Sequence, residues 1–163
     1  NFILFHFDEK WIYKQYLKSY IDIEPNSYLD LINFLEKIAN KTNNNLIIST
    51  GNRNNKFIEN FKNDFSEINT NIYNFNKNKI FFLNNLSMKQ LEFVISKCFT
   101  IVTCHGAPTH IAAAFNKKII DIIDVSEKLF FVKWSAHFRK YEQLHRFEFN
   151  KLSEIILSKI SNK

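Results

Sequence analysis

The chain has 163 residues, of which 45% are hydrophobic, enough for one domain with a substantial core. Its 22 basic and 16 acidic side chains give a net charge of +6, which favours anionic partners such as nucleotides, acidic lipids or nucleic acid. An AT-rich coding sequence is an alternative source of this charge, since Lys, Asn, Ile and Phe are all abundant. No apolar run approaches the ~18 residues of a membrane-spanning helix and no secretory signal is visible, so no transmembrane segment is predicted, although the missing signal carries little weight if an N-terminal half precedes this chain.

Strand and helix patterns alternate along the chain. The predicted strands lie at residues 2–7, 46–49, 71–75, 80–83, 99–103 and 119–123. The predicted helices begin after the capping residues Ser27, Asn54 or Asn55, and Ser87, and a closing amphipathic helix is predicted at 152–160. Residues 8–24 are interpreted as a loop with a short helix. The alternation predicts an α/β fold, a Rossmann-like three-layer sandwich with a mostly parallel sheet.

The most informative segment is a strand–turn–helix corner at residues 99–115. A buried strand enters a turn of small residues, and a helix is predicted from Thr109. Unpaired backbone N–H groups and the helix dipole converge at such a corner and attract anions. Gly106 and Ala107 allow a ligand to approach the backbone, and His110 adds a donor or a charge. A plain structural corner is the alternative, because many α/β proteins have one with Pro near the helix start.

The chain contains two glycines, Gly51 and Gly106, and each follows a predicted strand. Ligands of parallel α/β sheets bind at the carboxyl ends of the strands, where both glycines are expected. Thr50 and Gly51 are therefore predicted as a second point of ligand contact. Arg53 is a weaker candidate for facing a diphosphate, since guanidinium suits that geometry.

The corner resembles the motif of the family 9, heptosyltransferase-like glycosyltransferases, which have the GT-B fold. In that family an Asp-Ser/Thr-Gly-Pro-x-His turn precedes a Leu-Ala-Ala-Ala-type helix. Here Pro108, His110 and the alanines at 112–114 match. His105 stands where the family usually has Asp, and Ala107 where it has Gly, so the ligand contacts are expected to differ.

The resemblance extends beyond the motif. Residues 86–98 are similar to the helix before the motif strand in the family, and the similarity covers most of residues 1–125. A GT-B enzyme has two Rossmann-like domains with the active site between them. The resemblance therefore implies that residues 1–163 form the C-terminal, nucleotide-sugar-binding domain. The N-terminal acceptor domain is expected to be absent from this chain, which begins with Asn rather than Met.

The resemblance also implies a function. The domain would bind a nucleoside-diphosphate sugar and transfer the sugar to a glycan or to a lipid-linked, lipopolysaccharide-type acceptor in the bacterial cell envelope. The location would be cytoplasmic, free or at the inner membrane surface. No cofactor and no metal ion are expected, and the chain alone should be inactive because the catalytic base would lie in the absent half.

Residues are assigned from the family residue by residue. His105, Gly106, Ala107, Thr109 and His110 would hold the diphosphate. A lysine shortly before a tryptophan contacts the donor phosphates in the family, and Lys10 before Trp11 matches it; an exposed loop lysine is the alternative. The family also has an acidic residue that meets the ribose, for which Glu59 is the nearby candidate.

Two other functions remain open. A degenerate, non-catalytic Rossmann-like module that binds a protein or glycan is favoured by the missing Asp and Gly of the motif. Aromatic and basic residues interleave at 133–140, with His145 and Arg146 beyond, a pattern that binds RNA or acidic glycans, although it more often forms a solvated face, so nucleic acid is not the expected partner.

Cysteine and histidine spacing limits the remaining chemistry. Cys98 and Cys104 flank one predicted strand about 20 Å long, too far apart for a disulfide, so free thiols are expected. No HExxH or paired CxxC motif is present, and no metal site is predicted. A structural role for His110, as a cap or a core residue, is the alternative to its role at a ligand.

Overall fold

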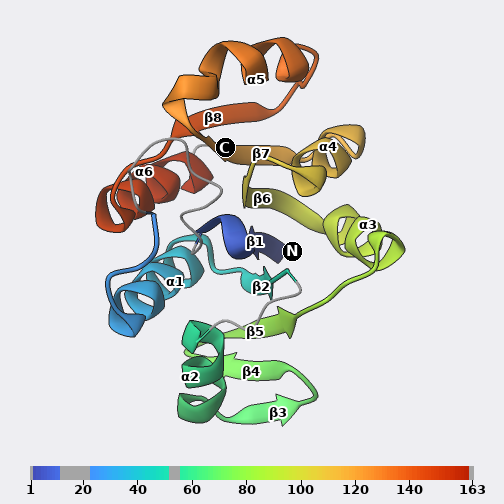
Figure 1. Cartoon of the computed structure of the whole chain (residues 1–163). Helices are drawn as coiled ribbons and strands as arrows, with labels where there is room; N and C mark the ends of the chain where they lie inside the picture. Colours follow the sequence, from blue (N-terminus) through green and yellow to red (C-terminus); the bar gives the residue numbers. More distant parts are fainter. Residues whose placement is uncertain (1, 12–22, 52–55, 162–163) are drawn as a thin grey trace.

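The computed structural model describes residues 2–11, 23–51 and 56–161, which form one eight-stranded sheet with helices on both faces (Figure 1). The strands are β1 (Phe2–His6), β2 (Asn45–Ser49), β3 (Glu67–Asn69), β4 (Ile72–Phe75), β5 (Asn78–Leu83), β6 (Cys98–Cys104), β7 (Lys118–Ile123) and β8 (Tyr141–His145). The helices are α1 (Tyr28–Thr42), α2 (Lys56–Asp64), α3 (Met88–Lys97), α4 (Ala107–Ala114), α5 (Lys128–Ser135) and α6 (Phe149–Ser161), with 3₁₀ turns η1 (Glu9–Trp11) and η3 (Val125–Glu127). The α/β class and the Rossmann-like architecture are confirmed.

The sheet is mostly parallel, with strand order β3-β4-β5-β2-β1-β6-β7-β8. Every pair from β5 to β8 in this order is parallel, whereas β3 with β4 and β4 with β5 are antiparallel. His6 at the end of β1 is in register with Ser49 of β2 and Thr103 of β6. The strands predicted at 2–7, 46–49, 99–103 and 119–123 run parallel as β1, β2, β6 and β7, and their carboxyl ends therefore meet at one edge of the sheet.

The two faces of the sheet bury separate cores. α1, α2 and α6 cover one face, and α3 and α4 cover the other (Figure 1). Consecutive strand residues point to opposite faces. Ile3 and Phe5 accordingly join the large aromatic-rich core, whereas Leu4 joins the smaller core with Ile95 and Ala112. Burial on both faces explains why the central strands are continuous apolar runs.

The predicted helix starts are confirmed where the structure describes them. The Ser27 hydroxyl accepts a hydrogen bond from the amide three residues later (3.2 Å) and begins α1. Ser87 and Gln90 form a reciprocal capping box at the start of α3. The start predicted at Asn54 or Asn55 lies outside the described residues. Among these residues, no helix combines the length and the apolar character needed to cross a membrane.

Asparagine takes the left-handed backbone positions. The described non-glycine residues with positive φ are Asn43, Asn71, Asn76, Asn85 and Asn116. Asn adopts this region more readily than most residues, because its short side chain bonds locally. Neither glycine has a positive φ. The two glycines therefore serve another purpose.

Several elements differ from the prediction. β3, α5 and β8 were not predicted, because exposed edge strands and an exposed helix lack the usual hydrophobic periodicity. In β8, for example, Leu144 is buried and the other residues are half-exposed. The motif helix α4 begins at Ala107, two residues before the predicted Thr109, and α6 begins at Phe149 rather than at residue 152.

Candidate functional site

The predicted corner joins β6 to α4 through His105 and Gly106. Gly106 caps α4 with an extended backbone, φ 171° and ψ −159°, which any residue adopts. Its missing side chain matters for a different reason: a Cβ at this position would contact the Nζ atom of Lys10. Gly106 therefore leaves room for a cation beside the N-terminus of α4.

The first turn of α4 is only partly open to a ligand. The Gly106 amide donates to Thr109 Oγ1 (3.2 Å), and the Thr109 amide donates to the Gly106 carbonyl (3.0 Å). Pro108 has no N–H. Within the described part of the chain, the Ala107 amide has no internal partner. An anion at this corner would thus meet the Ala107 amide, the positive end of the helix dipole and the Lys10 ammonium.

Lys10 reaches the corner from η1, directly after β1. Its Nζ donates to the His105 carbonyl (2.6 Å) and lies 4.0 Å from Asp8 Oδ2. Trp11 fixes the turn, because its ring is 1% exposed and its Nε1 donates to the His6 carbonyl (2.9 Å). The structure therefore brings together Lys10 and the motif turn, two predicted site elements 95 residues apart in the sequence.

A buried carboxylate organises the corner from β7. Asp121 is 0% exposed; its Oδ2 receives hydrogen bonds from His105 Nδ1 (2.5 Å) and the Tyr141 hydroxyl (2.7 Å), and its Oδ1 from the Thr109 hydroxyl (2.9 Å). Burial, followed by the charge and the hydrogen bond of Asp121, raises the pKa of Tyr141, which stays a donor. Sequence analysis missed Asp121. The sequence feature that could have indicated Asp121 is a single carboxylate within an apolar strand, because a buried charge requires partners.

His110 points outward from α4 and is not part of the core. Its ring lies 5.2 Å from that of His105 and 5.5 Å from that of Phe138, measured between centroids. Partial burial of the ring, and then the charge of His105, lower the pKa of His110, with His137 adding to the effect. Near neutral pH the ring is therefore an uncharged hydrogen-bonding group.

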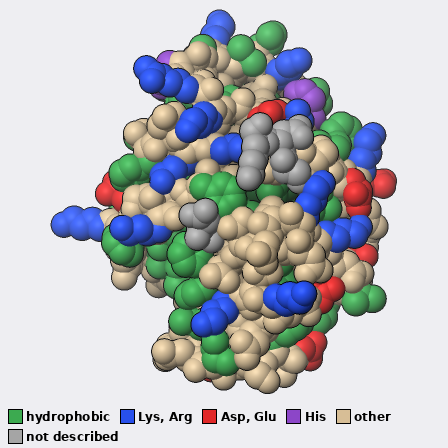
Figure 2. Space-filling view, turned by 180° about the vertical axis from the view of Figure 1, so that it is seen from behind, with side chains coloured by type: hydrophobic (Ala, Val, Ile, Leu, Met, Phe, Trp, Pro, Cys, Tyr) green, Lys and Arg blue, Asp and Glu red, His purple; other side chains and the backbone are tan. Residues whose placement is uncertain are grey.

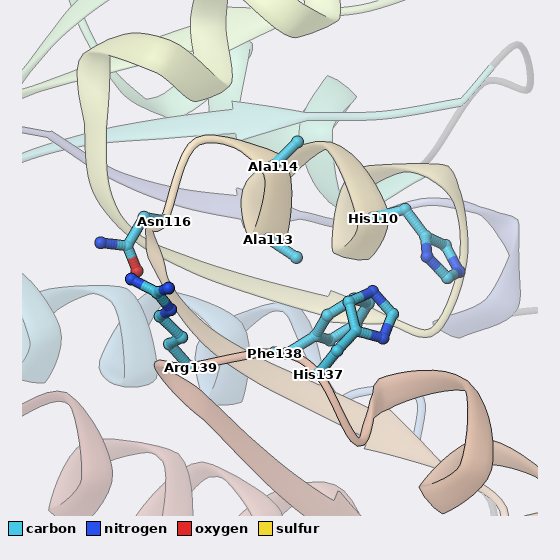
Figure 3. A pocket seen from close by; sticks show the side chains of 7 residues that line it. All are labelled: His110, Ala113, Ala114, Asn116, His137, Phe138 and Arg139. Carbon is cyan, nitrogen blue, oxygen red and sulfur yellow. The ribbon is translucent and has the colours of Figure 1, made fainter.

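A shallow cavity of about 380 Å³ opens beside His110 (Figure 3). The lining side chains come from α4, from the turn that follows it and from the segment between α5 and β8: His110, Ala113, Ala114, Asn116, His137, Phe138 and Arg139. None of them is acidic. The segment 133–140, noted in the sequence for its aromatic and basic residues, thus contributes half of a cavity rather than only a solvated face.

The second predicted contact, Thr50 and Gly51, lies at the end of β2 and is half-buried. The Thr50 amide donates to the Leu83 carbonyl (3.0 Å). A Cβ on Gly51 would contact Glu9 Oε2. This oxygen is buried and has no hydrogen-bond partner among the described residues. Consecutive residues of η1 thus face the two glycines, a carboxylate at Gly51 and an ammonium at Gly106.

Two other residues were candidates from the sequence. Arg53 is outside the described residues. Glu59 is exposed on α2 and is not brought to either glycine.

Arg146 is a further residue that sequence analysis did not assign to the site. It follows β8, is 6% exposed, and donates from Nη1 to the Lys10 carbonyl (3.3 Å), while its Nε has no partner in the part of the chain described. Together with Lys10 and His105 it lines a small cavity of about 130 Å³ that also includes Asp124 and Glu127. Arg146 therefore helps to fix the position of Lys10 through this hydrogen bond to its carbonyl group.

Both cysteines are free and buried, as the spacing predicted. Burial raises the pKa of the Cys98 thiol to about 12 and raises that of Cys104 as well, although nearby Arg146 opposes the second shift. Neither thiol is a nucleophile near neutral pH.

The structure assembles one Ser-His-Asp arrangement at the same edge. Ser49 Oγ lies 2.7 Å from His6 Nδ1, and His6 Nε2 lies 3.6 Å from Asp8 Oδ2. Ser49 is 0% exposed, so no substrate can reach it and the contact joins β1 to β2. The described residues contain no group of three or more His, Cys, Asp or Glu side chains placed to hold a metal ion.

Comparison with known proteins gives a likeness in fold. No family model matches the sequence, and no curated protein matches it. In fold, the chain is similar to the solved structure of EarP, which mediates arginine glycosylation of translation elongation factor EF-P. The TM-score is 0.51 at 9% identity, over 85% of this chain and 40% of the EarP chain. The chain thus spans less than half of that neighbour, and the likeness shows a Rossmann-type α/β fold.

Proposed function

We propose that this chain is the nucleotide-sugar-binding domain of a two-domain glycosyltransferase of the GT-B type, similar to family 9. The observation that carries the proposal is the Lys10 ammonium, held 2.6 Å from the His105 carbonyl and against Gly106 at the N-terminus of α4. The likeness in fold to a protein of arginine glycosylation supports the same class of reaction.

The diphosphate of the donor would bind between Lys10 and α4. Lys10 Nζ exchanges its hydrogen bond to the His105 carbonyl for a phosphate oxygen, and the Ala107 amide supplies a second donor. His105, whose Nδ1 is held by Asp121, and His110 border this position. Negative charge grows on the leaving diphosphate during transfer, and a fixed ammonium and a helix N-terminus stabilise it. This charge stabilisation requires neither a cofactor nor a metal ion.

The Gly51 corner would bind hydroxyl groups instead of phosphate. The buried Glu9 Oε2 lacks a hydrogen-bond partner among the described residues, and a carboxylate oxygen accepts from the hydroxyls of ribose or of the sugar. Thr50 and Gly51 form the adjacent backbone. Glu9 thereby takes the role that sequence resemblance assigned to Glu59.

The other half of the reaction would reside on a second domain. A glycan or lipid-linked acceptor and the catalytic base are placed there by analogy with two-domain GT-B enzymes. We expect the 163-residue chain alone to show no sugar transfer, and we propose a cytoplasmic location, where nucleotide sugars are available.

A non-catalytic module that binds a protein or glycan is the second candidate. It is favoured by the internal use of the Gly106 amide and of the Lys10 ammonium, which leaves few donors for a ligand. The two candidates differ in whether a nucleoside diphosphate binds.

Calorimetric titration with a panel of nucleoside diphosphates tests the proposal. We expect one of them to bind, and Lys10→Met to weaken binding by about 1.5–3 kcal/mol, the range for a hydrogen bond to a charged group. Lys79→Met is the matched control, because Lys79 is exposed near the amino end of β5, away from this edge. Absence of binding by every diphosphate, or equal losses in both variants, would overturn the proposal.

A further inference from the structure

Helix α5 leaves most of its apolar side chains in contact with water. The exposed fractions are 81% for Leu129, 57% for Phe130, 45% for Val132 and 56% for Trp134. The helix contacts the rest of the protein through the half-buried Phe131, whose ring lies 4.2 Å from that of His105. Four large apolar residues exposed on one eight-residue helix require an explanation, whereas single exposed ones do not.

Basic residues lie among these apolar ones. Residues 125–140 contain Lys128, Lys133, Arg139 and Lys140, all exposed, against the single acidic residue Glu127. Lys133 is four positions after Leu129 and three after Phe130, so it lies between them on the helix surface. At the upper end of Figure 2, where α5 lies, hydrophobic and basic side chains are adjacent.

This combination does not fit a protein partner. Lysine is depleted in the buried centre of protein interfaces, yet Lys133 lies in the middle of the apolar residues. A helix of eight residues is also about 12 Å long, too small to provide the roughly 800 Å² per partner of a stable dimer. A second copy of this chain is therefore a poor occupant.

A lipid surface fits both features. Apolar side chains of an interfacial helix enter the boundary between headgroups and acyl chains, and lysines extend along them to keep their ammonium groups among anionic headgroups. Tryptophan is favoured at the same depth. The neighbouring cavity, lined by His137 and Arg139 without an acidic side chain, continues the anion-attracting surface (Figure 3).

We propose that α5, together with Lys128, Lys133, Arg139 and Lys140, docks the protein onto an anionic phospholipid bilayer. Trp134 and Phe130 enter the interface, and the four basic side chains select anionic lipid. The proposal concerns the exposed side chains of α5 and does not require that a nucleotide bind at the neighbouring Gly106 corner.

The different exposure of the two tryptophans allows binding to lipid to be followed by fluorescence. Trp11 is 1% exposed and Trp134 is 56% exposed, so a change in fluorescence on binding reports mainly on Trp134. The full chain is titrated with vesicles of equimolar phosphatidylglycerol and phosphatidylcholine, and with vesicles of phosphatidylcholine alone. We expect a blue shift and co-sedimentation with the anionic vesicles, weakened by salt, and at least about tenfold weaker binding to the neutral ones.

Matched variants distinguish docking through α5 from nonspecific adsorption to the vesicles. Phe130→Ser with Trp134→Ser should reduce co-sedimentation with anionic vesicles at least about tenfold, since two interfacial aromatic side chains are lost. Phe93→Ser is the control: Phe93 is 63% exposed on α3 and has Lys97 beside its ring, 5.2 Å from the centroid. It should bind as the parent does, and thermal melting should confirm that all variants fold.

Three results would overturn the proposal. One is failure of the parent chain to bind anionic vesicles. Another is equal binding by the α5 variant and the Phe93 control. The third is self-association of the parent, measured by sedimentation equilibrium without lipid and lost in the α5 variant, which would make α5 a protein interface.

Discussion

The two corners that contain glycine differ in the charge that faces them. Gly51 follows β2 and Gly106 follows β6, and both lie at the carboxyl edge of the sheet. A Cβ on Gly51 would contact the Glu9 carboxylate, and a Cβ on Gly106 would contact the Lys10 ammonium. Neighbouring residues of the same short turn therefore give the corners opposite electrostatic character.

This difference shows that a local sequence pattern does not determine which kind of ligand a corner can bind. A strand followed by a glycine predicts room for a ligand beside the backbone at both corners, and in the structure a side chain occupies that room at each. What approaches is a side chain from another segment, and its charge determines the ligand chemistry. An anion suits only the Gly106 corner, whereas the Gly51 corner suits a hydrogen-bond donor.

The largest expected effect comes from removing the anchor that both corners share. Trp11→Ala deletes a ring packed 4.9 Å from Phe5 and 5.5 Å from Phe7, together with its hydrogen bond to the His6 carbonyl. We expect the free energy of unfolding, measured by urea denaturation, to fall by about 3–5 kcal/mol. Glu9 and Lys10 should lose their positions together, so both corners change in one variant.

A smaller fall in the free energy of unfolding, with diphosphate binding unchanged, would contradict the expectation for Trp11→Ala. It would mean that η1 is held at Gly106 by the Lys10 hydrogen bond rather than by Trp11.

Gly106→Val against Gly51→Val distinguishes the two corners. At Gly106 the extended backbone accepts valine, and the new side chain displaces the flexible end of Lys10. We therefore expect diphosphate binding to weaken by about 1.5–3 kcal/mol, with little change in thermal melting. Gly51→Val displaces the end of Glu9 instead and should leave binding of inorganic pyrophosphate unchanged.

Calorimetry with pyrophosphate measures this difference. Equal losses in both variants would show that the two corners form one anion site, and no loss in either would make the Gly106 turn a plain structural corner.

Much of the fold follows from local patterns, because the central strands are buried on both faces. Ile3, Leu4 and Phe5 are all buried, so their run is apolar without alternation and easily recognised. Ser27 and Ser87 mark helix starts through hydrogen bonds within a single turn. β8 was not predicted, because an edge strand is partly exposed to solvent and its residues need not be apolar.

The site was less predictable because its contacts join distant segments. Lys10 and the motif turn were both predicted, from resemblance to a family, but their contact spans 95 residues and no spacing rule indicates it. Asp121 was missed because it is a single charged residue in an apolar strand, and Arg146 was noted only with a basic, aromatic segment and not as a neighbour of Lys10. Their importance comes from burial, which becomes visible only when the sheet is assembled.

Glu9→Gln should have a smaller, selective effect on the Gly51 corner. The change removes a negative charge while keeping the shape of the side chain. We expect affinity for a nucleoside diphosphate to fall about fivefold, because one acceptor for a ligand hydroxyl is weakened, while pyrophosphate binds as tightly as before or slightly more tightly. The control is Glu59→Gln, since Glu59 is exposed on α2.

Parallel calorimetric titrations with the two ligands decide the matter. If Glu9→Gln weakens both equally, then Glu9 acts by positioning Lys10, and the two corners are not chemically separate.

The smallest expected effect is a pH dependence at the Gly106 corner alone. The pKa of His110 is lowered from its ordinary value of 6.5 by partial burial and by the charge of His105. The unfolded chain therefore binds a proton at His110 more readily than the folded chain as pH falls through 6.5, and stability is lost in that direction. In His110→Gln this proton uptake is absent, so the free energy of unfolding should decline less steeply between pH 6.5 and pH 5. Urea denaturation of parent and variant across this window measures the two slopes. Parallel slopes would mean that His110 titrates alike in both states and senses neither His105 nor the corner. A shallower slope in the variant would show that the protonation of His110 depends on its folded position beside His105 at the Gly106 corner.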